Sequence, residues 1–199
     1  MKAMNNSCHF GEVIESSLHT FLAQSWQWDT APAFASLLVA RVGTRTVFGL
    51  VHQVQTGSSD ATRHPIAYKK TEEELKRDQP QIFSFLKTTL SCCVVGYQEN
   101  GHILYVLAPD PVKIHTMIRQ STQEEYKNFF ASDHYLALLF GAHTDIHIDE
   151  LFLAIMRNQI ALGLLSEQRL EQLVATFSLL INNDYVRLRL LLNRVESFM

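Results

Sequence analysis

The chain has 199 residues, of which 47% are hydrophobic and 19% are charged, and its formal net charge is −3. This balance is typical of a globular protein and excludes an intrinsically disordered chain. The small negative charge predicts no general attraction to nucleic acid or acidic membranes, although a local basic patch stays compatible with it.

The start of the chain and its hydropathy predict a soluble, cytoplasmic protein without a membrane partner. Residues 1–10 contain neither the apolar core nor the cleavage site of a signal peptide. No run approaches the roughly 18 consecutive apolar residues that a membrane span requires. The cysteines are Cys8, Cys92 and Cys93, without a CxxC spacing. We interpret Cys92 and Cys93 as buried thiols on opposite faces of a strand in a reducing compartment.

The first part of the chain has the pattern of short β-strands. Runs rich in β-branched and aromatic residues lie at 11–16, 18–24, 36–41 and 46–54, with turn signals between them. Two further candidate strands, 91–98 and 102–108, flank Asn100 and Gly101. An Asn-Gly pair favours a tight hairpin, because both residues of the turn need positive φ.

A helical insertion near residues 71–88 interrupts the strand pattern. Thr71 and Glu74 have the spacing of a capping box, and Pro80 suits the first turn of a short helix. Six strands with this insertion before a closing hairpin predict a small closed barrel, because an open sheet would leave two edges unpaired.

The β pattern ends after Pro111, and helical periodicity follows. Thr122 and Glu125 form a second capping box, while Asp133, Asp149 and Ser166 are candidate caps of later helices. Four or five helices are expected, packed on each other and on the barrel. The sequence therefore predicts an α+β fold, with a β-barrel over residues 8–120 and an α-helical domain over residues 121–199.

The last helical segment carries an apolar stripe after a break at residues 182–184. Its members are Leu188, Leu191, Leu192 and Val195. A stripe at this spacing defines one face of a helix, and that face could seal an interface.

Motifs for nucleotide chemistry and hydrolysis are absent from the sequence. Nothing matches GxxxxGK[ST], GxGxxG or GxSxG, so no catalytic residue and no cofactor is predicted. The densest group of polar side chains is residues 143–150. There His143 and His147 are four apart and could share a metal ion, with oxygen from Asp145, Asp149 or Glu150. The alternative is a solvated loop that runs into a helix cap, which is the reading we favour.

Three other groups are candidates for interaction rather than catalysis. The middle of the chain is locally basic, with Arg63, Lys69 and Lys70 at its start, but Glu72–Glu74 and Asp78 dilute the charge and favour a solvated face. His115 alternates with apolar neighbours, which favours a structural or interfacial role. Trp26 and Trp28 share one face of a strand end. Core packing is favoured for this pair, and an exposed pair would mark a partner site.

Several segments together resemble a known family. FGEVIES (10–16), SLLVAR (36–41), TVFGLVHQV (46–54) and APDPVKIHTMI (108–118) are similar to the HAS barrel. That small β-barrel lies at the front of HerA-type DNA-translocating ATPases and of rotary ATP synthase subunits. Stand-alone HAS-barrel proteins are the nearest in pattern, through residues 63–70, 78–88, 94–97 and 109–115. The resemblance covers residues 8–120.

Two departures qualify what the resemblance implies. Ala35 stands where the family pattern has a glycine, and no ATPase domain follows the barrel. In the family the barrel is a collar that assembles rings and mediates protein contacts, so the resemblance implies an assembly or adaptor role.

Three functions therefore stay open on the sequence. The first is a non-catalytic adaptor or self-associating module that docks on a protein complex, such as a ring ATPase or another DNA-processing machine. The second is a nucleic-acid binder that uses residues 63–77 together with the two tryptophans, which would show steep salt dependence. The third is a metal-dependent enzyme built on His143 and His147.

Overall fold

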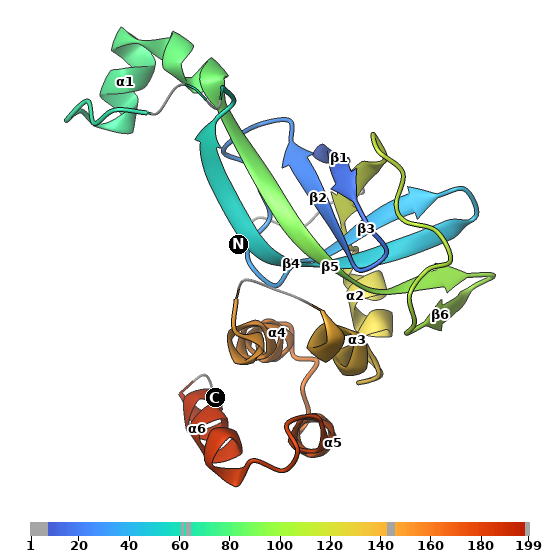
Figure 1. Cartoon of the computed structure of the whole chain (residues 1–199). Coiled ribbons are helices and arrows are strands. Elements are labelled where there is room, and N and C mark those ends of the chain that lie inside the picture. The colour runs from blue at the N-terminus through green and yellow to red at the C-terminus, as the bar shows by residue number, and fades with distance from the viewer. Residues whose placement is uncertain (1–7, 61, 63–64, 143–145, 198–199) are drawn as a thin grey trace.

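Six antiparallel strands close into a ring in the computed structural model, which describes residues 8–60, 62, 65–142 and 146–197. The strands are β1 (Gly11–Ser16), β2 (Thr20–Ser25), β3 (Leu37–Val42), β4 (Arg45–Ser58), β5 (Leu86–Glu99) and β7 (Met117–Gln120). Around the ring they run β1, β7, β3, β4, β5, β2, and β2 pairs back with β1 (Figure 1). Closure pairs both edges of the sheet and confirms the predicted barrel.

The sixth strand of the ring is not the one expected. β6 (His102–Leu104) pairs with β5 outside the ring, so the strand predicted over residues 102–108 is wrong in length and in place. β7 closes the barrel instead by pairing with both β1 and β3. β7 has four residues, and only Ile118 is buried. A strand this short with one buried side chain shows no alternating pattern in the sequence. The hairpin turn itself is confirmed, with φ of 51° at Asn100 and 83° at Gly101.

Strands β3, β4 and β5 are buried on both faces. One set of apolar side chains, including Phe21, Leu38 and Cys92, fills the barrel. The next residues along the same strands, including Leu37 and Cys93, point outward and pack against the helices. The prediction for the two cysteines is therefore confirmed: both are buried free thiols on opposite faces. Burial raises the pKa of both thiols, that of Cys93 to about 12.

Beyond the ring, β4 and β5 continue as a two-stranded arm. The arm ends at α1 (Glu72–Asp78) and at the 3₁₀ helix η1 (Pro80–Phe85), which Figure 1 shows well away from the helical layer. The Thr71 hydroxyl accepts from the Glu74 N–H at 3.2 Å, and the Glu74 carboxylate accepts from the Thr71 N–H at 2.9 Å. The predicted capping box is confirmed, but neither helix buries a side chain.

The helical half contains α2 (Gln123–Phe129), α3 (Tyr135–Gly141), α4 (Ile148–Ala161), α5 (Glu167–Leu180) and α6 (Tyr185–Glu196). The capping residues Thr122 and Ser166 are confirmed. The caps expected at Asp133 and Asp149 are wrong, because α3 follows His134 and α4 follows His147. None of the described helices has the length and apolar character needed to cross a membrane.

The helices α2, α3 and α4 lie on the outer face of β3, β4 and β5, and α5 and α6 lie beyond them (Figure 1). The Phe48 ring of β4 lies 4.9 Å from that of Phe129, and the rings of Phe152 and Phe177 stack at 4.5 Å. Ala35 is fully buried at this junction with φ of 61°, a left-handed conformation that favours glycine. The backbone conformation thus suits the glycine of the HAS-barrel pattern although the side chain is alanine.

Candidate docking face on the carboxyl-terminal helices

The apolar stripe of α6 is used inside the molecule. Leu191 and Val195 are buried, and Leu188 belongs to the same cluster with residues of α4 and α5. Leu192 is half-buried. The helical layer itself covers Leu191 and Val195, and an interface sealed by the stripe stays a prediction.

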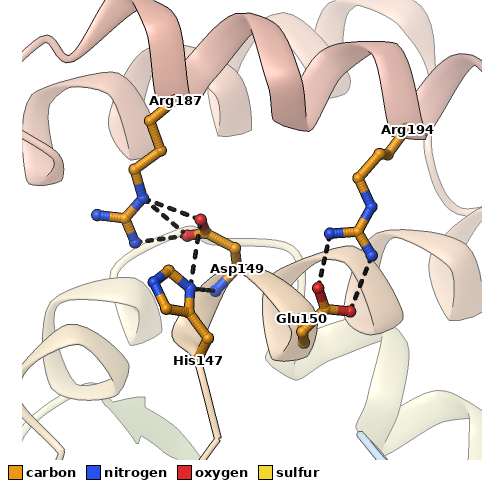
Figure 2. A network of polar contacts seen from close by, with 5 residues as sticks. All are labelled: His147, Asp149, Glu150, Arg187 and Arg194. Atoms are coloured by element: carbon orange, nitrogen blue, oxygen red, sulfur yellow. Dashed lines mark hydrogen bonds and ion pairs between the residues drawn. The ribbon is translucent and has the colours of Figure 1, made fainter.

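Two ion pairs fix α6 against the start of α4 (Figure 2). Arg187 binds Asp149, with its Nε 2.9 Å from Oδ2 and its Nη2 2.5 Å from Oδ1. Arg194, two turns further along α6, binds both carboxylate oxygens of Glu150 at 2.6 and 2.8 Å. The paired arginine lowers the pKa of Glu150, and the paired carboxylate raises the pKa of Arg187. Two bidentate contacts set the rotation of α6 as well as its position.

His147 is part of the same network. Its Nδ1 accepts the N–H of Asp149 at 3.4 Å and lies 3.3 Å from the carboxylate of that residue (Figure 2). His143 and Asp145, the other members of the predicted metal site, lie outside the described residues. Within the described part of the chain, no three His, Cys, Asp or Glu side chains gather in a way that could hold a metal. Asp149 and Glu150 instead bind arginines.

The outward side of the α5–α6 end exposes large apolar side chains. Five large hydrophobic residues of the described chain are more than 60% exposed. One is Ile66 on the arm, and the other four are Leu179, Tyr185, Val186 and Leu190, with exposures of 62–76%. We call these four residues the docking face.

The docking face has helical order on α6. Val186 and Leu190 are one turn apart and therefore neighbours on the surface of α6, where they lie outside the buried stripe of Leu191 and Val195. A surface hollow of about 420 Å³ runs beside them over the Arg187–Asp149 pair. Exposed apolar side chains of the docking face therefore border a hollow that is also lined by the paired side chains of Asp149 and Arg187.

Arg189 and Asp184 are the charged residues beside the docking face that the structure leaves exposed. Their neighbours Arg187 and Arg194 are neutralised by α4, whereas no salt bridge within the described chain pairs Arg189. Asp184 caps the start of α6 and Arg189 lies further along the helix, so the face carries charges of both signs beside its apolar groups.

The tryptophan pair is not in the core. β2 ends at Ser25, so Trp26 and Trp28 lie in the turn after the strand, and Trp26 is 54% exposed. Trp28 stacks on Phe83 of η1 with ring centroids 5.4 Å apart. The core interpretation is therefore wrong. Trp28, in the loop after β2, instead packs on Phe83 at the end of the arm.

The basic stretch is largely neutralised by its own carboxylates. Lys70 and Arg77 each bind Asp78 at 2.9 Å, and Lys76 binds Glu72 at 2.6 Å. Lys69 is exposed, and Arg63 lies outside the described residues. The solvated face favoured by the sequence fits these pairs.

His115 and a second apolar hollow complete the candidate sites. His115 is exposed in the turn before β7, with φ of 65° and its Nδ1 3.1 Å from the Glu12 carboxylate. On the arm, Ile66, Tyr68 and Phe83 border a hollow of about 530 Å³. Nothing in its charge distribution selects an occupant.

The docking face was missed in the sequence because α6 is apolar on more than one side. The stripe of Leu188, Leu191, Leu192 and Val195 accounts for a buried face, and Val186 and Leu190 are apolar residues in excess of it. These two extra apolar residues were the available signal in the sequence.

Compared with known proteins, the sequence matches no family model and no curated protein, so the likeness to the HAS barrel stays a resemblance.

Proposed function

We propose that this chain is a non-catalytic assembly or adaptor module that binds a protein partner through Leu179, Tyr185, Val186 and Leu190. The observation that carries the proposal is the concentration of strongly exposed apolar side chains on one helical end. Single exposed apolar residues are normal on monomers, but a group of them with a polar rim is typical of a protein-binding surface.

Arg189 beside the docking face favours an acidic partner. A second copy would bring both Arg189 and the exposed Asp184 to the interface, so charge gives no reason to prefer self-association. An amphipathic helix with acidic residues beside its apolar stripe would instead place a carboxylate near Arg189 and an apolar anchor between Val186 and Leu190. Helices of this kind bind apolar surfaces through residues spaced by three and four.

Binding of two helical peptides of opposite charge tests the proposal. The peptides share one apolar stripe and carry either glutamates or lysines on its flanks. We expect the acidic peptide to bind the full chain more tightly in fluorescence anisotropy and to weaken in high salt. The double variant Val186→Ser/Leu190→Ser should lose this binding, whereas Ile66→Ser on the arm should keep it. Full binding by the double variant would reject the docking face, and equal binding of the two peptides would reject the preference for an acidic partner.

The native mass separates this proposal from self-assembly. Light scattering should give a monomer near 22.7 kDa, because the proposed partner is a different protein. A dimer that becomes monomeric in the Val186→Ser/Leu190→Ser variant would show that the occupant is a second copy.

A further inference from the structure

One side of β4 is unpaired where the strand enters the arm. β3 and the residues just before it pair with β4 as far as Val51. Beyond this point, β4 pairs only with β5 among the described residues. One side of residues 53–58 is therefore open along the projecting part of β4 (Figure 1). We call this open side the arm edge.

The backbone of the arm edge presents hydrogen-bonding groups at every second residue. Ser59 donates its N–H to the Phe85 carbonyl at 2.7 Å and therefore faces β5. No bulge interrupts the pairing of β4 with β5 between residues 53 and 58. Because successive residues of an antiparallel strand face opposite sides, Val54, Thr56 and Ser58 direct their backbone groups away from β5. Each of them has one N–H donor and one C=O acceptor.

The arm edge lacks the residues that usually prevent strand addition. Proteins protect such edges with charged side chains, with proline or with a covering segment. Residues 53–58 (QVQTGS) contain neither a charge nor a proline, and residues 54–56 are exposed. The β5 side of the arm differs, because the Thr88 hydroxyl donates to the Trp28 carbonyl and the Trp28 ring stacks on Phe83. The loop after β2 thus covers β5 and leaves the arm edge accessible.

An apolar hollow lies at the end of the arm edge. Ser58, the last residue of β4, lines the hollow of about 530 Å³ together with Leu86, its partner on β5. Ile66 and Tyr68 border the same hollow and are 70% and 39% exposed. Ser58 shares one face of β4 with Val54, because side chains alternate along a strand. A strand added to the arm edge would direct every second side chain along this face, toward the hollow.

The edge and the hollow together define the class of ligand. An unpaired strand edge binds an extended backbone through main-chain hydrogen bonds, and a neighbouring pocket selects one of its alternate side chains. A helix is excluded, because its own N–H and C=O groups bond to each other. A second copy fits less well, because Val54 is the only hydrophobic residue of its arm edge and the hollow is bordered by large apolar groups.

We propose that the arm edge binds an extended segment of a partner protein as an added strand, with a large apolar side chain of that segment in the hollow. The added strand turns the two-stranded arm into a three-stranded sheet. It also supplies packing to the arm, where neither α1 nor η1 buries a side chain and an isolated hairpin is marginally stable. The proposal goes beyond the docking face, because it uses other residues and a ligand without helical structure.

Binding of a synthetic extended peptide to the full chain tests the proposal. The fluorescent probe has about ten residues, with threonine alternating with isoleucine, one central phenylalanine and a lysine at each end. Two control peptides carry N-methyl groups on one or the other alternate set of backbone nitrogens. In fluorescence anisotropy, the unmodified probe should bind and only one of the two controls should lose binding. No saturable binding of the probe, or equal binding of both controls, would overturn the proposal.

Thr56→Pro and Thr56→Val form a matched pair of variants. Both lose the bond between the hydroxyls of Thr56 and Thr88, but only proline also removes the outward N–H. Proline is tolerated where the N–H of an edge strand faces solvent, so the pairing of β4 with β5 should survive. We expect Thr56→Pro to bind the probe about tenfold more weakly and Thr56→Val to bind it like wild type. Equal binding by the two variants would overturn the proposal.

Amide hydrogen exchange of the free chain tests the edge without a ligand. The amides of Val54 and Thr56 should exchange at least about tenfold faster than those of Gln55 and Gly57, because only the latter face β5. Addition of the probe should slow the exchange of Val54 and Thr56. Slow exchange of Thr56 in the free chain would show that its N–H already has a partner, and would overturn the proposal.

Variants of the two surfaces separate this proposal from the proposed function. Ile66→Ser should weaken binding of the extended probe and keep binding of the acidic helical peptide. Val186→Ser/Leu190→Ser should have the opposite effect. Light scattering of wild type and Thr56→Pro tests for a second copy at the arm edge. A wild-type dimer that Thr56→Pro converts to a monomer would show that a second copy occupies the arm edge, and would overturn the proposal.

Discussion

Leu190 and Leu191 are adjacent leucines of α6 with opposite surroundings, and truncating each to alanine tests how α6 is placed. Leu191 is 3% exposed and packs in the core cluster of the helical half, whereas Leu190 is 62% exposed. Both changes have the same effect on helix propensity, so the difference between them reports packing alone.

The expected magnitudes follow from burial. Removing a buried leucine side chain costs about 2–5 kcal/mol, and the lower half of this range suits Leu191 because α6 lies at the margin of the core. For a chain of this length, about 2–3 kcal/mol corresponds to a fall of roughly 5–10 °C in unfolding temperature. Leu190→Ala should stay within about 0.5 kcal/mol of wild type, as surface substitutions usually do.

Urea and thermal unfolding followed by circular dichroism would measure both variants. The reasoning is refuted if the two variants lose the same stability, or if Leu190→Ala loses more. Either result would mean that Leu190, and not Leu191 alone, packs in the core of the helical half.

Other predictions concern an ion pair, a titration and the barrel interior. Arg187→Gln should lower the free energy of unfolding in urea by about 1–2 kcal/mol, because it leaves the mostly buried Asp149 carboxylate without its cation. Arg194→Gln should lower it less, because the ion pair of Arg194 with Glu150 is half-exposed. Equal costs would contradict the geometry. Arg119 lowers the pKa of Glu125, so Glu125 stabilises the fold above its ordinary pKa of 4.5 and loses this contribution as the pH falls through the lowered value. Glu125→Gln should therefore be less stable than wild type in urea titrations at pH 7, and the difference should shrink as the pH falls below 4.5; a pH-independent difference would contradict this. In Gly49→Ala, the new Cβ would overlap the Phe21 ring inside the barrel. A loss of about 1–3 kcal/mol in urea unfolding is expected, and wild-type stability would show that the ring can move away.

Local chemistry made parts of the fold predictable. The capping boxes at Thr71 and Thr122 and the turn at Asn100–Gly101 are encoded within four residues, and all three are confirmed. The strands that fill the barrel are apolar on both faces, so their long apolar runs were visible without knowledge of their partners.

Features that depend on distant residues could not be predicted. β7 is recognisable only through β1 and β3, which pair with it from earlier in the chain. Asp149 does not cap its helix because Arg187, 38 residues later, binds its carboxylate. Trp28 packs on Phe83 from the arm rather than in the core.

The candidate site was hidden for a related reason. α6 has apolar residues on several faces, and its packing on α4 and α5, together with two ion pairs to α4, decides which of them turn inward. The sequence pattern identified the buried stripe and left Val186 and Leu190 without a role.

The most direct test of the docking face is to map where the acidic amphipathic peptide binds, by amide chemical shifts of the isotope-labelled full chain. We predict that the perturbed amides lie at the end of α5 and along α6, around Val186, Arg189 and Leu190. Perturbations centred on the arm, around Ile66 and Phe83, or on the barrel strands would contradict the proposed function.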